Sequence, residues 1–160
     1  MAYIGALAVI FAVFLIWREY SSYLDKELSA CRAFLSAVTD YREKVRCYLD
    51  SPKEWAKNYD SELLDGCGFL GLLREGADFG EAYLEIRDKL CLSDKTDAIL
   101  SSCFQRLGEG YLEGELEILA LAIEKLGKEE AASSVEFVKK KKAVGAMLGA
   151  VAAGIVILII

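Results

Sequence analysis

Charged residues are confined to the middle of the chain. Residues 1–17 and 143–160 contain no charged side chain, whereas all 19 Lys and Arg and all 25 Asp and Glu lie within residues 18–142. A long run without charge partitions readily into lipid, while a segment this rich in charge favours water. The pattern predicts a transmembrane helix over 1–17, a helical domain outside the membrane over 18–142 and a second transmembrane helix over 143–160.

The two charge-free runs differ in length, and each has a different alternative to the interpretation as a membrane span. The C-terminal run, AVGAMLGAVAAGIVILII, would extend about 27 Å as a helix, close to the hydrocarbon thickness of a bilayer. Its alternative is the core helix of a soluble protein, which usually shows a polar face. The N-terminal run is shorter, and its alternative is a cleaved signal peptide. Because no basic residue precedes it and no A-x-A-like site follows it, an uncleaved anchor is favoured.

Basic residues flank both runs on the side of the central domain. Arg18 follows the first run, and Lys139, Lys140, Lys141 and Lys142 precede the second. Basic residues near the ends of spans remain on the cytoplasmic side, so residues 18–142 are expected to be cytoplasmic. The formal net charge of −6 makes nucleic acid an unfavourable partner, since phosphate binding needs a basic surface.

The central domain shows helical periodicity throughout. Residues 20–50 carry a heptad-like seam on a helix that is expected to continue from the first span. The seam consists of Leu24, Leu28, Cys31, Leu35, Val38, Val45 and Leu49. New helices are predicted after it by three start signals, which are the capping boxes Ser51–Glu54 and Asp78–Glu81 and the pair Ser93–Asp94.

Two further apolar stripes follow the last of these starts. One comprises Ile99, Leu100, Cys103, Phe104 and Leu107, and the other comprises Leu112, Leu116, Leu119, Ile123 and Leu126. Ordinary core packing explains both stripes, and no stretch outside the two runs alternates convincingly with period two. The predicted fold class is all-α, a helical bundle in the cytoplasmic domain flanked by an N-terminal and a C-terminal transmembrane helix.

Residues 65–71, DGCGFLG, contain the spacing G-x-G-x-x-G of a dinucleotide-binding turn at Gly66, Gly68 and Gly71. That chemistry needs a strand before the glycines and a helix after them. The preceding YDSELLD is polar and helix-like, and Glu85, at the distance of the ribose-binding acid, falls in a predicted helix. We therefore expect no dinucleotide cofactor and assign the glycines to a close approach between packed helices or to a helix break.

Side chains typical of metal or nucleophile sites are sparse. The chain has five cysteines without a C-x-x-C pair and has no histidine, which argues against a zinc site and against a cysteine nucleophile activated by imidazole. The thiols of a cytoplasmic domain are expected to be reduced and buried. The sequence predicts neither a catalytic site nor a metal nor another cofactor.

Small residues recur along the second charge-free run. Gly145 and Gly149 form a G-x-x-x-G, and Ala150 and Gly154 repeat its spacing. In lipid, close approach of small residues supplies contact between helices. This face could pack against the first span, where Gly5, Ala8 and Ala12 also share one face, or against a second copy, and a plain anchor is the alternative.

The order of these segments resembles the stage III sporulation protein AB family. The resemblance is carried by FLGLLREGADFGEAY, then AILSSCFQRLG, an acidic leucine-rich helix, a KKKK run and the terminal glycine-bearing run. The matching residues are Phe104, Leu107, Gly108, Leu119, Leu126, Glu130, Lys141, Gly145 and Gly149. The chain departs from the family in having GEGYLEGE where Asp and Gln usually follow the leucine-glycine pair.

The resemblance implies a non-enzymatic part of the channel between mother cell and forespore, located in the mother-cell membrane around the forespore. The helical domain of this family is similar to the cytoplasmic domains of F-type platform proteins of type II secretion, which couple an assembly ATPase to the machine above. It thus implies other channel proteins, including an ATPase, as partners. The alternative is a membrane-anchored helical adaptor or regulator unrelated to sporulation.

Overall fold

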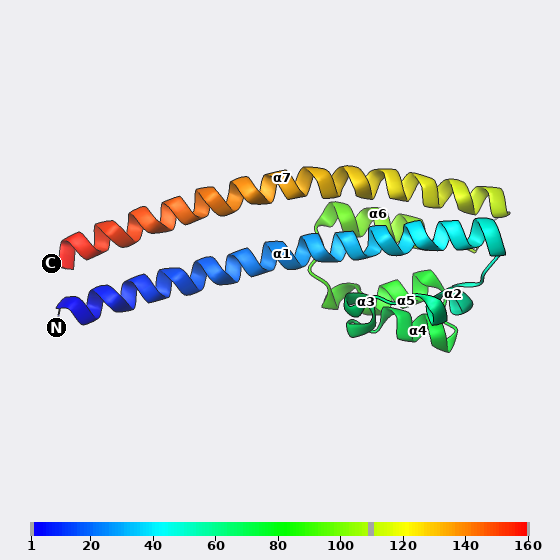
Figure 1. Cartoon of the computed structure of the whole chain (residues 1–160), viewed down its shortest axis with the longest axis horizontal. Coiled ribbons are helices and arrows are strands. Elements are labelled where there is room, and N and C mark those ends of the chain that lie inside the picture. The colour runs from blue at the N-terminus through cyan, green and yellow to red at the C-terminus, as the bar shows by residue number, and fades with distance from the viewer. Residues whose placement is uncertain (1, 109–110, 160) are drawn as a thin grey trace. The chain divides into compact units, whose positions relative to one another are not determined.

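The computed structural model describes residues 2–108 and 111–159, and every regular element within them is a helix (Figure 1). The all-α prediction is confirmed for this part of the chain. The elements are α1 (Ala2–Tyr48), α2 (Pro52–Asn58), α3 (Glu62–Gly66), α4 (Phe69–Glu75), α5 (Phe79–Ile86), the 3-10 helix η1 (Arg87–Lys89), α6 (Asp94–Phe104) and α7 (Leu112–Ile159).

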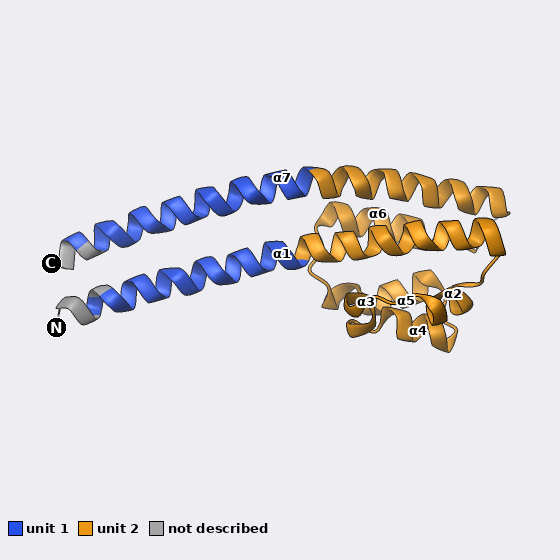
Figure 2. Ribbon diagram, viewed as in Figure 1, with its two compact units in different colours: residues 1–26, 132–160 blue, residues 27–131 orange. Residues whose placement is uncertain are grey.

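The chain divides into two compact units, shown in different colours in Figure 2. Unit 1 comprises residues 1–26 and 132–160, and unit 2 comprises residues 27–131. Both α1 and α7 contribute one segment to each unit, so the predicted continuity of the first charge-free run with the helix after it is confirmed. The expected membrane boundaries, after residue 17 and before residue 143, stay predictions.

The short helices of unit 2 begin where the sequence indicates. The Ser51 hydroxyl accepts a hydrogen bond from the Glu54 N–H at 3.3 Å, and the Asp78 carboxylate accepts one from the Glu81 N–H at 2.7 Å. Ser93 caps α6 in the same way, with 3.2 Å to the Thr96 N–H. These side chains satisfy backbone donors that have no partner inside the first turn, and all three predicted helix starts are confirmed.

The glycines of the DGCGFLG segment separate two helices. Gly66 ends α3, Gly68 precedes α4 with φ +90°, and Gly71 lies inside α4. The left-handed conformation at Gly68 is available to glycine at little cost, which confirms the predicted helix break. A close approach of backbones is wrong, because a Cβ added at any of the three would meet no atom within 4 Å.

The core of unit 2 is built around aromatic rings. Phe34 of α1 is fully buried and lies 5.3 Å from the Phe69 ring of α4 and 5.8 Å from the Tyr83 ring of α5. The Phe79 and Phe104 rings stack at 5.3 Å. Edge-to-face and stacked pairs at these distances add to the free energy gained from apolar burial. The core therefore joins α1 to the short helices that gather along it in Figure 1.

The predicted seam of α1 is partly wrong. Leu24, Cys31, Val38 and Val45 are buried as expected, but Leu28 and Leu35 are half-buried. Leu49 lies outside the helix, with φ +56° and 70% of its surface exposed. The buried face instead centres on Phe34 and Tyr41, because several helices pack against this part of α1 and a strict heptad describes only a narrow two-helix contact.

Candidate functional site

The apolar side chains of unit 1 are largely exposed. Leu7, Phe11 and Ile16 of α1 and Met147 and Val151 of α7 each expose half or more of their surface. Apolar patches of this kind mark an interaction with lipid or protein. Within the residues that the structure describes, one helix, α1, is long and apolar enough to cross a membrane, and only 6% of its most apolar 18-residue stretch is buried. This favours membrane association through α1, whereas a second membrane-spanning helix is not shown.

A large side chain packs against one of the predicted packing glycines. A Cβ added to Gly145 would lie 3.2 Å from Trp17 Nε1, so the indole occupies the space beside this glycine. A cavity of about 350 Å³ borders this contact, and it is lined by Ile10, Val13, Phe14, Trp17, Gly145, Leu148, Gly149 and Ala152. Trp17 is therefore a packing residue of unit 1 that the small-residue pattern missed.

The other small residues of unit 1 have open surroundings. A Cβ at Gly149 or Gly154 would meet no atom within 4 Å, and Ala150 is exposed. Gly5 likewise has no neighbour within 4 Å, while Ala8 and Ala12 are exposed. The structure thus does not pair the small-residue face of the first run with that of the second. The role of Gly145, Gly149, Ala150 and Gly154 in contact between spans or copies stays a prediction.

The basic run joins the two helices of unit 1 through one ion pair. Lys141 Nζ lies 2.6 Å from Asp25 Oδ1, and the Lys141 side chain is only 25% exposed. Lys140 pairs with Glu136 one turn earlier on α7 at 2.7 Å. Arg18, Lys139 and Lys142 are exposed. Asp25 is 64% exposed, so this pair adds at most about 1 kcal/mol to the contact of α1 with α7, beside the role expected of the lysines at a membrane boundary.

The family-matching residues of unit 2 build the fold. Phe104 belongs to the aromatic core, and Leu119 and Leu126 of α7 are fully buried. Leu107 is half-buried against this core, and Gly108 turns the chain with φ +90°. The Gly108 N–H donates to Glu115 Oε1 at 3.0 Å, which fixes the turn to the first turn of α7. These positions therefore carry packing and a turn.

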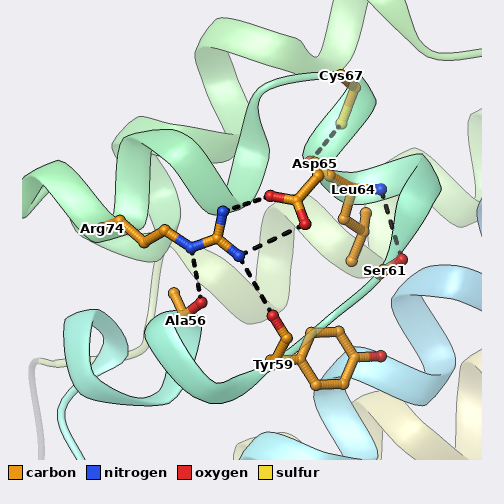
Figure 3. Close-up of polar contacts among 7 residues, drawn as sticks. All are labelled: Ala56, Tyr59, Ser61, Leu64, Asp65, Cys67 and Arg74. Atoms are coloured by element: carbon orange, nitrogen blue, oxygen red, sulfur yellow. Dashed lines mark hydrogen bonds and ion pairs between the residues drawn. The ribbon is translucent and has the colours of Figure 1, made fainter.

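One arginine ties three short helices together, as Figure 3 shows. Arg74 Nε donates to the Ala56 carbonyl at 2.9 Å, Nη2 donates to the Tyr59 carbonyl at 3.3 Å, and Nη1 pairs with the Asp65 carboxylate. The planar guanidinium suits such a fork of acceptors, two of which are carbonyls at the end of α2. Sequence reasoning missed this cluster, and its one signal was a lone arginine within the apolar FLGLLREG.

The thiols and glycines of unit 2 do not assemble reactive chemistry. All five cysteines are free, burial raises the pKa of Cys103 to about 12, and burial also raises the pKa of Cys31. Both thiols are therefore protonated near neutral pH and poorly nucleophilic. Within the described ranges, no group of His, Cys, Asp and Glu could hold a metal ion. The DGCGFLG glycines join two helices, which is not the geometry of a pyrophosphate-binding turn.

Comparisons with known proteins place the chain in a family. Searches of curated proteins and of solved structures gave no match. The sequence model of stage III sporulation protein AB matches residues 2–160, which is nearly the whole chain. The match covers both long helices and every short helix between them. The chain therefore belongs to the stage III sporulation protein AB family.

Proposed function

We propose that this chain is a non-enzymatic membrane platform of the channel between mother cell and forespore, and that its helical domain contacts an assembly ATPase. Family membership is the observation that carries the proposal, since it makes this a sporulation-related protein. The alternative, an adaptor unrelated to sporulation, loses support for the same reason.

The architecture supports a platform with two anchors. Each of the two longest helices runs from a charge-free terminal segment into a helical domain with a continuous buried core. In this proposal residues 143–160 form a second span, both spans lie in the mother-cell membrane around the forespore, and residues 18–142 face the mother-cell cytoplasm. A continuous helix gives a membrane anchor a stiff connection to the domain that it carries.

Thiol labelling tests the topology. Cys47 is the exposed native cysteine, so a variant that retains only this thiol reports the side on which the domain lies. An impermeant maleimide is expected to leave Cys47 unlabelled in intact cells and to label it after lysis. In non-sporulating cells that produce a cysteine-free variant, the protein enters the plasma membrane, and a cysteine appended after Ile160 is then expected to be labelled without lysis, because two spans place that end outside the cell.

A binding measurement tests the platform role. The full-length protein in lipid nanodiscs is expected to bind the purified secretion-type ATPase of the same organism, and nanodiscs without the protein serve as the control. Cells that lack the chain are expected to form no spores and to recover when the chain is supplied again. Normal sporulation in those cells would contradict the proposal, as would labelling of Cys47 in intact cells.

A further inference from the structure

Unit 2 contains an acidic cavity of about 210 Å³, at the place where α1 ends and α2 and α5 begin. Its lining residues are Tyr41, Asp50, Ser51, Pro52, Asp78, Phe79, Leu107, Gly108 and Glu115. Three of these carry carboxylates, and none is a lysine or an arginine. The cavity exceeds the volume of about 150 Å³ that holds a benzene molecule in a protein core, so a long side chain fits inside it.

Two of the three carboxylates also serve the fold. Asp78 accepts the Glu81 N–H at the start of α5, and Glu115 accepts the Gly108 N–H. Asp50 differs from them, since the described part of the chain offers it neither a hydrogen bond nor an ion pair. A helix cap explains the charge of Asp78 and a turn explains that of Glu115, whereas the charge of Asp50 has no such explanation.

Tyr41 is a second observation that points to a ligand. Only 5% of its surface is exposed, and its ring packs 4.6 Å from Phe79 and 5.4 Å from Trp55. Its hydroxyl has no hydrogen-bonding partner within residues 2–108 and 111–159. Because Tyr41 lines the cavity, this oxygen is free to accept a hydrogen bond from a ligand there. Burial, together with the charges of Glu115 and Asp50, raises the pKa of Tyr41, so the phenol is near these carboxylates and is protonated.

We propose that this cavity is a docking pocket for a lysine or arginine side chain of a partner protein. The rings of Tyr41 and Phe79, together with Pro52 and Leu107, offer apolar surface to the aliphatic stem of such a side chain. The carboxylates attract its cationic head, and the Tyr41 oxygen can accept one of its hydrogen bonds. A side chain that is apolar along its stem and cationic at its end therefore matches both the apolar lining residues and the carboxylates of the cavity.

The inference rests on the proposed function in one respect, the identification of the partner as the assembly ATPase. Variants that remove the three negative charges and keep the hydrogen bonds of Asp78 and Glu115 to the backbone test the inference in the full-length protein in nanodiscs. The pocket variant combines Asp50→Asn, Asp78→Asn and Glu115→Gln, since an amide oxygen accepts the same backbone hydrogen bonds. The control combines Asp60→Asn, Glu85→Gln and Glu117→Gln, which removes three negative charges from exposed positions.

Binding of the purified ATPase is the first measurement. The pocket variant is expected to bind at least about tenfold more weakly than wild type, as for the loss of close charge pairs in an interface, and the control is expected to match wild type. Equal binding by the pocket variant and wild type would overturn the pocket and leave the ATPase contact standing. Equal weakening in both variants would also overturn it, because net charge alone would then explain the effect.

A second measurement separates the pocket from the proposed function. If wild type binds no ATPase, the ATPase contact fails, and the pocket is judged by titration with Nα-acetyl-arginine amide while the Gly108 amide resonance is followed. A saturable shift that is absent with the citrulline analogue and lost in the pocket variant supports the pocket. No shift overturns it. Saturable binding of spermidine to the pocket, with ATPase binding unchanged in the pocket variant, would identify a small cation as the occupant and overturn the protein partner.

Discussion

Phe34, Phe69 and Leu126 of unit 2 are fully buried, whereas Leu7 and Phe11 of unit 1 leave about two thirds of their surface exposed. The contrast lies within single helices, because α1 and α7 each contribute to both units. In water, apolar burial stabilises a fold, while in lipid it supplies no drive between helices. The two stretches of α1 are therefore suited to different surroundings, and four pairs of substitutions test the contrast between the units.

The largest effect is expected in the aromatic core. Phe34→Ala removes a ring that contacts Phe69, Tyr83 and Phe104, and it should lower the free energy of unfolding by about 3–5 kcal/mol. Phe11→Ala, at a 62% exposed position, should change it by less than about 0.5 kcal/mol. Denaturant melts of the full-length protein in detergent measure both, and equal effects would abolish the distinction between the units.

Arg74→Ala should have the next largest effect. It leaves the Ala56 and Tyr59 carbonyls and the Asp65 carboxylate without their donor, which should cost about 1–3 kcal/mol. Arg46→Ala is the matched control, because Arg46 is 59% exposed in a loose pair with Glu43 and should contribute less than about 0.5 kcal/mol. The same melts apply, and a neutral Arg74→Ala would show that the fork of acceptors does not hold α2, α3 and α4 together.

In unit 1 the expected change is in helix contact. Gly145→Leu places carbon where the Trp17 indole lies, so disulfide crosslinking between Val13→Cys and Leu148→Cys in a cysteine-free variant should fall by about half. Gly149→Leu should change the crosslinking less, because no atom lies within 4 Å of its added Cβ. If Gly149→Leu has the stronger effect, small-residue contact outweighs the Trp17 contact. If neither changes it, residues 143–160 are a plain anchor.

The smallest effect is expected at the ion pair between the helices of unit 1. Lys141→Ala should lower the free energy of unfolding by at most about 1 kcal/mol, because Asp25 is mostly exposed and salt screens such pairs. Lys142→Ala, next to it, is the control. Melts at low and high ionic strength measure the difference, which should shrink as salt rises. A loss that persists at high salt would point to packing of the lysine stem.

Local features of the sequence predicted where the short helices begin, but they did not predict which side chains from different helices contact one another. Ser51, Asp78 and Ser93 each accept a hydrogen bond from a backbone N–H three residues away, so a short sequence pattern is enough to predict them. The heptad seam did not include Phe34, because the aromatic neighbours of Phe34 come from three other helices, α4, α5 and α6. Arg74 binds carbonyls fifteen and eighteen residues away, which no local spacing encodes.

The same limit applies to the acidic cavity. Asp50, Asp78 and Glu115 are far apart in the chain and come together only through the packing of α1, α5 and α7. Tyr41 lay on no predicted apolar stripe, although its ring is among the most buried of α1. The family resemblance could be recognised from the sequence because it depends on the order of segments and on short motifs. Both can be read from the sequence without knowing any tertiary contact.

The continuity of α1 determines where the domain can be cut. A fragment that begins at Glu27, the first residue of unit 2, starts inside a helix and exposes four backbone N–H groups that the preceding turn now satisfies. Five residues earlier, Ser22 and Asp25 form a Ser-x-x-Asp sequence that can cap a new terminus. A fragment that begins at Ser22 should therefore retain about 1 kcal/mol more stability than one that begins at Glu27.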